Sequence, residues 1–130
     1  MKALTPTALR APFGNYAHGV EIPAGARIVQ TSGQLGIRTD DSIPPEAQTQ
    51  AEICFASITE ILRVAGMTPD NVFHIAAYVT DRAHMPGYMA ARDAFVGQRQ
   101  HLPSSTLVIV SGFTRLEFKV EVEVMAAASD

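Results

Sequence analysis

The chain has 130 residues, of which 47% are hydrophobic and 18% are charged, and its formal net charge is −3. These values predict one globular domain over residues 1–130 and exclude a disordered chain. Cys54 is the only cysteine, which excludes an internal disulfide framework and a cysteine-based zinc site and fits a reducing compartment. No run of Lys and Arg marks a surface for nucleic acid or membranes, and no apolar stretch reaches the roughly 20 residues of a membrane span. Because residues 1–10 lack the apolar core of a signal peptide, we expect a cytoplasmic protein.

The first half of the chain predicts an arm, two short strands and a helix. Residues 1–15 are rich in Pro and Ala and are expected to form a mobile or loosely docked arm. Short strands are predicted over 17–22 and 27–32, followed by a long loop over 35–45 that could begin as a further short strand. A helix is predicted over 45–66, because apolar residues recur at helical spacing, a Pro suits its first turn and a Gly its end.

The second half predicts three strands and a second helix. Residues 72–79 are apolar almost throughout and predict a buried strand. A helix is expected from about residue 85 to 100, followed by strands over 106–110 and 115–127. The period of this second helix is set by Tyr88, Met89, Arg92, Phe95 and Val96.

This order of elements favours a two-layer α+β domain with a mixed sheet of five or six strands. Right-handed crossovers would place both helices on one face of that sheet. The other face is then half apolar, because the last strand places polar residues on it while the middle strands place apolar residues on it. Such a face is a candidate interface between subunits.

Few residues carry a local signature of chemistry. The four histidines are scattered, which disfavours a metal site, and no glycine-rich loop suits a nucleotide. Cys54 lies on the apolar stripe of the first helix, where a small buried side chain is expected rather than a nucleophile. Glu121 and Glu123 are two apart on one strand, so both point to one face, about 7 Å apart. They could do acid–base work or form a solvated face.

Several segments, taken in order along the chain, resemble one family. The chain is similar to the RidA/YjgF (reactive intermediate deaminase) family over nearly its full length. The resemblance is carried by residues 14–19 (GNYAHG), 31–34 (TSGQ), Gln50, 64–67 (VAGM), 70–81 (DNV to VTD), 103–106 (PSST) and 120–126 (VEVEVMA).

The resemblance implies a chorismate-mutase-like fold with two helices on one face of the sheet. It also implies a homotrimer whose sheets face inward, with clefts between neighbouring subunits. Archetypal members hydrolyse reactive enamines and imines to a keto acid and ammonia, and they need no metal or organic cofactor. The implied partners are therefore a small molecule and two further copies of the chain.

The site residues are carried over one by one. Tyr16 matches the cleft tyrosine of the family, Ser32 and Gly33 match a strand end that lines the cleft, and Glu121 matches the glutamate thought to orient or activate water. The residues alone leave Tyr16 open between packing and catalysis. They also leave Gly33 open between an ordinary strand end and a cleft.

Two positions depart from the family pattern. Ser105 replaces the arginine that grips the substrate carboxylate, and Met89 replaces a cleft asparagine. A guanidinium binds a carboxylate with two charge-assisted hydrogen bonds, so its loss should cost about 2–5 kcal/mol for an anionic substrate. Amino-acid-derived imines therefore become doubtful substrates, unless another arginine substitutes. The sequence offers Arg10, Arg38 and Arg115 as examples.

Three functions follow from these residues. The first is a cofactor-free hydrolase of enamines or imines with a shifted substrate range, in which Glu121 positions water, Tyr16 donates to the substrate and Ser105 binds it. The second is a non-catalytic trimer that binds a small metabolite or acts in regulation, because Ser105 and Met89 remove cleft chemistry. The third, RNA cleavage, is attached to some members and is disfavoured by the net charge of −3.

Overall fold

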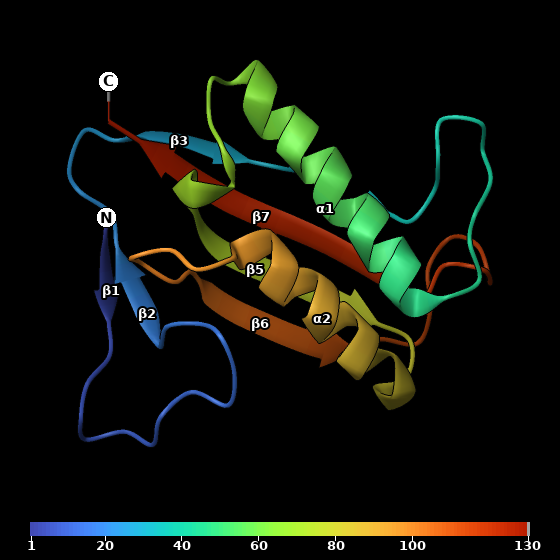
Figure 1. Ribbon diagram of the computed structural model, residues 1–130, viewed down its shortest axis with the longest axis horizontal. Helices are drawn as coiled ribbons and strands as arrows, with labels where there is room; N and C mark the ends of the chain where they lie inside the picture. The colour runs from blue at the N-terminus through green and yellow to red at the C-terminus, as the bar shows by residue number, and fades with distance from the viewer. Residues whose placement is uncertain (130) are drawn as a thin grey trace.

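The computed structural model describes residues 1–129 (Figure 1). The predicted domain extends to Asp130, which lies outside the described residues. The main sheet consists of β3 (Arg27–Gln30), β4 (Gln34–Leu35), β5 (Val72–Val79), β6 (Ser104–Ile109) and β7 (Val120–Ala128). The strand order is β3-β7-β5-β6, and β4 also pairs with β7. β5 and β6 run parallel and the other pairs are antiparallel, so the sheet is mixed, as predicted.

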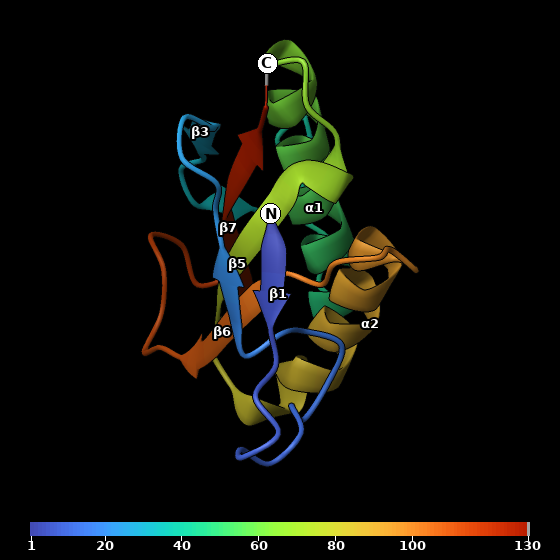
Figure 2. The same ribbon diagram turned by 90° about the vertical axis from the view of Figure 1, so that its left-hand side faces the viewer.

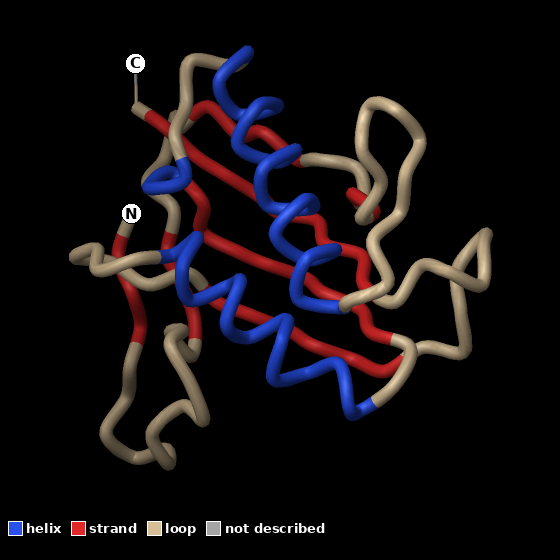
Figure 3. The backbone as a smooth tube through the Cα atoms, turned by 45° about the vertical axis from the view of Figure 1, so that its right-hand side comes forward, coloured by secondary structure: helices blue, strands red, loops and turns tan. Residues whose placement is uncertain are grey.

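Two helices cover one face of this sheet. α1 (Ala47–Val64) and α2 (Met85–Val96) lie side by side on it, and the edge-on view shows two layers (Figures 2 and 3). Two short 3-10 turns, η1 (Pro69–Asn71) and η2 (Arg82–His84), precede β5 and α2. The predicted α+β class and chorismate-mutase-like fold are confirmed. Among the described residues, neither helix is both long and apolar enough to cross a membrane.

The core lies between the helices and the sheet. It is formed by fully buried residues of both layers, among them Ile58, Leu62, Ile75, Val79, Tyr88, Val120, Val122 and Val124. Each such side chain contributes roughly 1.5–3 kcal/mol when it leaves water. Because side chains alternate along a strand, the residues between these core positions face the opposite side of the sheet. No helix covers that side, which we call the open face (Figure 2).

The N-terminal arm differs from its prediction. β1 (Lys2–Leu4) pairs antiparallel with β2 (Gly19–Glu21) in a separate two-stranded sheet. Lys2 stands opposite Glu21 in this register, so opposite charges meet across the pair. The arm is therefore tied down at its start, and the strand predicted over 17–22 is shorter and lies outside the main sheet.

Two further elements differ from their predicted bounds: α2 ends earlier than predicted, and β7 begins later. α2 ends at Val96 rather than near residue 100, because Gly97 takes a φ of +61° and its N–H caps the carbonyl of Asp93 at 2.9 Å. Arg99 then turns back and donates to the carbonyls of Pro69 and Val72. β7 starts at Val120, and the residues before it form an exposed loop that is tethered by the buried Phe118.

Gln50 fixes this loop to the start of α1. Its side chain is fully buried and donates to the carbonyls of Pro44 (2.8 Å) and Glu117 (2.9 Å), while its carbonyl oxygen accepts from the N–H of Lys119 (2.8 Å). Gly36 packs so closely on this helix turn that a Cβ atom there would overlap Gln50. A single amide thus joins the start of α1 to a loop that lies 67 to 69 positions later in the sequence.

Candidate functional site

A pocket of about 210 Å³ lies between the loop that precedes β2, helix α2 and strand β6. It is lined by Phe13, Gly14, Tyr16, Met89, Arg92, Ser105 and Leu107. Ser105 stands beside the fully buried Ile75 in the parallel β5–β6 register, which places its side chain on the helix-covered side of the sheet. Three of the predicted site residues, Tyr16, Met89 and Ser105, are therefore neighbours in one pocket.

Tyr16 is held in place from both sides. The N–H of Ala17 donates to the carbonyl of Pro103 at 2.8 Å, which anchors the loop to the start of β6. The Tyr16 hydroxyl oxygen accepts a hydrogen bond of 3.2 Å from the N–H of Phe13. Because that oxygen acts as acceptor, the hydroxyl proton stays available for donation to a molecule in the pocket.

Arg92 is a pocket residue that the sequence analysis did not single out. It lies on α2, is only 4% exposed, and its guanidinium lies 5.9 Å from the ring centres of both Tyr16 and Tyr88. Its Nε and Nη2 atoms contact one carboxylate oxygen of Asp93, both at 3.2 Å. The sequence held a sign of this role, because Arg92 is a charged residue within the periodic stripe of apolar residues that faces the sheet.

The other predicted site residues lie on the open face. Glu121 stands opposite Tyr78 in the β5–β7 register, while its neighbours Val120 and Val122 are buried under the helices. Its side chain leans against Gly33, where a Cβ atom would come within 2.6 Å of Cδ of Glu121. Ser32 is exposed beside it, and its carbonyl accepts from the Gln34 amide at 3.1 Å. Burial, helped by the nearby charge of Glu123, raises the pKa of Glu121.

One chain therefore separates the predicted residues into two half-sites. Tyr16, Met89 and Ser105 line the pocket on the helix-covered side, whereas Glu121 of β7 lies on the open face beside Ser32 and Gly33, which directly precede β4. β5 stands between β6 and β7, so the two strands are about 10 Å apart. Tyr16 and Glu121 therefore lie on opposite sides of the sheet of one chain.

Comparison with known proteins identifies the family. The family model described as "Endoribonuclease L-PSP" matches residues 6–128. The chain belongs to the RidA/YjgF family. This membership, predicted from the order of its motifs, is confirmed.

Individual members of the RidA/YjgF family are distant relatives of this chain. The RutC family protein YjgH of Escherichia coli K12 is 23% identical over 121 residues, which cover 92% of this chain and 91% of YjgH. YyfB of Yersinia pestis, a Rid protein of unknown function, has a TM-score of 0.83 at 20% identity and 98% coverage of both chains. E. coli TdcF, solved with bound serine, has a TM-score of 0.73 at 24% identity, with 99% of this chain and 100% of TdcF covered. At these identities the solved structures establish a shared fold.

The arginines named as substitutes for the missing family arginine occupy different places. Arg10 stacks its guanidinium 4.2 Å above the ring of Phe13, at the rim of the pocket. Arg38 is bonded within its own loop to Ser42, and Arg115 lies over Phe118. Neither Arg38 nor Arg115 lines the pocket, whereas Arg92 does.

The open face of this RidA/YjgF chain carries a polar network next to Glu121. The Tyr78 hydroxyl donates to Glu123 at 2.5 Å, and this bond together with burial raises the pKa of Tyr78. His74 Nδ1 lies 2.7 Å from the hydroxyl of Ser104, and burial lowers the pKa of His74 against the opposing effect of Glu123.

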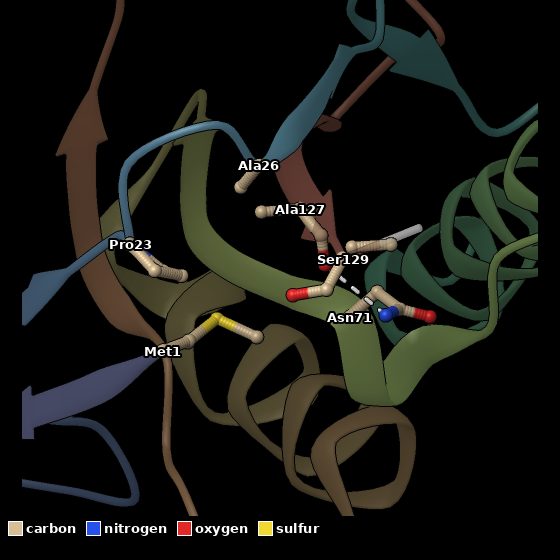
Figure 4. A pocket seen from close by; sticks show the side chains of 7 residues that line it. Met1, Pro23, Ala26, Asn71, Ala127 and Ser129 are labelled. Carbon is tan, nitrogen blue, oxygen red and sulfur yellow. Dashed lines mark hydrogen bonds between the residues drawn. The ribbon is translucent and has the colours of Figure 1, made fainter.

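A second hollow lies far from both half-sites. Figure 4 shows it between the N-terminus and the end of β7, lined mainly by short or apolar side chains. Its most polar side chain, Asn71, donates to the carbonyl of Ala127 at 3.1 Å and so serves to fasten β7. This hollow has the features of a packing defect between the two sheets and offers no set of reactive groups.

Cys54 and the histidines do not form a site. Cys54 is fully buried, as expected, and burial raises the pKa of its thiol to about 12, so it remains a neutral thiol. Among residues 1–129, no three His, Cys, Asp or Glu side chains come together in a way that could hold a metal ion.

Proposed function

We propose that this protein is a cofactor-free hydrolase of small reactive enamines or imines. The observation that carries the proposal is the complementarity of the two half-sites. One offers a tyrosine hydroxyl whose proton is free to be donated, and the other offers Glu121, whose pKa is raised. A donor and a base of this kind are what water addition to a C=N bond requires. Membership of the RidA/YjgF family, with Tyr16 and Glu121 at matching positions, supports the same chemistry.

The proposal requires more than one copy of the chain. We propose a homotrimer in which the open face at Glu121 of one subunit adjoins the Tyr16 pocket of the next. Such an arrangement would cover the uncovered sheet face and complete three clefts per trimer. A molar mass measured by light scattering would test it, since a monomer at micromolar concentration would contradict it.

The chemical steps balance without an added cofactor. Glu121 would accept a proton from water as the water oxygen bonds to the imine carbon, and the C=N π electrons would move to nitrogen, which then takes that proton to give a neutral carbinolamine. In the second step Glu121 would accept the carbinolamine hydroxyl proton and pass it to nitrogen as the C–N bond breaks, so that a carbonyl forms and ammonia leaves. Tyr16 would hold the substrate by donating a hydrogen bond. An enamine would enter the same path once its carbon is protonated.

The direct test is release of ammonia. Purified protein would be assayed on freshly generated 2-iminopropanoate and on neutral enamines, against the uncatalysed rate in buffer. The proposal predicts release above that rate, in the absence of added metal and with cytoplasm-like reducing buffer. No release above buffer from either substrate class would contradict it.

A second candidate function is supported by Ser105 and Met89. These residues stand where the family pattern has an arginine and an asparagine, so the pocket could bind a metabolite without turning it over. In that case a metabolite would raise the melting temperature although no ammonia is released. A screen in which no metabolite raises it would argue against this function.

A further inference from the structure

We propose that Arg92 is the anion-binding group of the pocket, and that the ligand is a small carboxylate with a short apolar chain. The inference concerns the pocket of the proposed function and names its ligand class. It replaces the expectation, based on Ser105, that amino-acid-derived imines are doubtful substrates.

The first step is the burial of the guanidinium. Arg92 is 4% exposed, and a buried charge is costly unless it is paired. Asp93 is its only carboxylate partner among the described residues, and it gives a single oxygen, shared by Nε and Nη2 at 3.2 Å. The Asp93 side chain is itself 51% exposed, so water weakens this pairing. Nη1 makes no hydrogen bond to any described residue.

The second step is the balance of donors and acceptors around the pocket. Tyr16 has a hydroxyl proton to donate, and the Ser105 hydroxyl forms no hydrogen bond with the rest of residues 1–129. With Arg92 this makes three donor side chains, whereas no Asp or Glu is among the lining residues. A lining of this kind fits a ligand rich in acceptor oxygens and negative in charge.

The third step is the space in front of the guanidinium. Gly14 lies beside Arg92, and a Cβ atom there would come within 3.0 Å of Nη2. The absence of a side chain at Gly14 leaves this part of the pocket open. The remaining wall is apolar and consists of Phe13, Met89 and Leu107. The pocket therefore combines one charged end with an apolar side, which matches a carboxylate that carries a short hydrocarbon chain.

The guanidinium of Arg92 reaches the pocket from another direction than the arginine of the family pattern. Ser105, on β6, occupies the position of that arginine, and Arg92 approaches the same pocket from α2. A substrate gripped by Arg92 would keep its carboxylate near the helix and place its reactive carbon toward the rim. Imines of 2-oxo acids with aliphatic side chains satisfy this description.

The experiment measures binding and needs no turnover. 2-Oxobutanoate and its neutral methyl ester would be titrated into the full-length protein while the Met89 methyl signal is followed by NMR. We expect the acid to bind at least about tenfold more tightly than the ester. Arg92→Gln should weaken the acid roughly 10- to 100-fold and leave the ester nearly unchanged.

Two further variants keep the test interpretable. Arg92→Lys retains the charge and should bind the acid with an affinity between those of the unaltered protein and Arg92→Gln. If Arg92→Gln does not fold, the lysine variant is compared with the unaltered protein alone. Arg63→Gln removes an arginine that is 72% exposed on α1 and should change neither affinity. Equal binding of acid and ester by the unaltered protein, no binding of the acid, or undiminished binding by Arg92→Gln would each overturn the inference.

Failure of this inference is distinct from failure of the proposed function. Binding of 2-oxobutanoate that depends on Arg92, without any release of ammonia, would support the inference and contradict the hydrolase. Release of ammonia from neutral enamines alone, together with equal binding of the acid and its ester, would support the hydrolase and contradict the inference.

Discussion

A Cβ atom at Gly33 would lie 2.6 Å from Cδ of Glu121, so the carboxylate of Glu121 occupies the space that only a glycine leaves free. The carboxylate thus owes its position on the open face to a residue on the neighbouring loop. This contact joins two residues that are 88 positions apart in the sequence, and it makes the first prediction possible.

Gly33→Ala should displace Glu121 and lower the rate of imine hydrolysis roughly 100-fold, because misplacing a catalytic group by about 1 Å costs that much. The unfolding free energy should change by less than about 1 kcal/mol, since the end of a glutamate side chain can move away. Ammonia release and urea denaturation would measure the two effects. Gly112→Ala, at a position with nothing within 4 Å, is the matched control. A Gly33→Ala protein with the full rate would contradict the assigned role of Glu121.

Glu121→Gln should lower the rate roughly 100- to 10,000-fold, because the amide cannot accept the proton from water. The raised pKa of Glu121 also predicts a pH profile. A base acts only when ionised, so the rate should fall as the pH drops through a pKa above the usual range of glutamate. Rates measured from pH 4 to 8 would show this acidic limb.

Glu123→Gln sharpens the pH test. The charge of Glu123 contributes to raising the pKa of Glu121, so its removal should move the acidic limb to lower pH. A limb that stays in place would show that the titrating group is not Glu121.

Gln50→Leu should lower the unfolding free energy by about 3 kcal/mol. The substitution leaves the carbonyls of Pro44 and Glu117 and the N–H of Lys119 without their buried partner. Chemical denaturation at fixed protein concentration would measure the loss. Gln48→Leu, an exposed position on the same helix, should stay within about 0.5 kcal/mol of the unaltered protein. Equal effects of the two variants would refute the structural role of Gln50.

Tyr88→Phe should stabilise the protein by about 1 kcal/mol, because the Tyr88 hydroxyl is buried and has no hydrogen-bond partner within residues 1–129. The ring contact with Phe55, at 6.0 Å between centres, would remain. Tyr78→Phe makes the same chemical change where the hydroxyl donates to Glu123, and it should destabilise by about 1 kcal/mol. Melting temperatures that shift in the same direction for both variants would contradict this distinction.

The sequence was most informative where one physical effect dominates. The strand over 72–79 was predicted with both ends in place, because a continuous apolar run bounded by turn residues has few other solutions. α1 was predicted within two residues at each end from its apolar period. The strand at Lys2–Leu4 was missed, because its stability comes from pairing with β2 rather than from its own residues.

In the candidate site, too, the sequence did not predict what depends on contacts between distant segments. Tyr16, Met89 and Ser105 were expected together and share a pocket, but their separation from Glu121 depends on which side of the sheet each strand presents. Arg92 was counted as part of a buried helix stripe. Its contact with the loop at Gly14 and Tyr16 is made between distant segments, which periodicity cannot reveal. The roles given to Tyr16 and Glu121 stay predictions.

The lining of the pocket, with donor side chains and no acidic one, has a practical consequence for work with this protein. Acetate, citrate and phosphate are small anions that offer the same acceptor oxygens as a carboxylate ligand, and they are present in many buffers at millimolar concentration. They would compete for the guanidinium of Arg92 and weaken every apparent affinity measured beside them. Titrations and rate measurements therefore belong in a zwitterionic or amine buffer with chloride as the counter-ion.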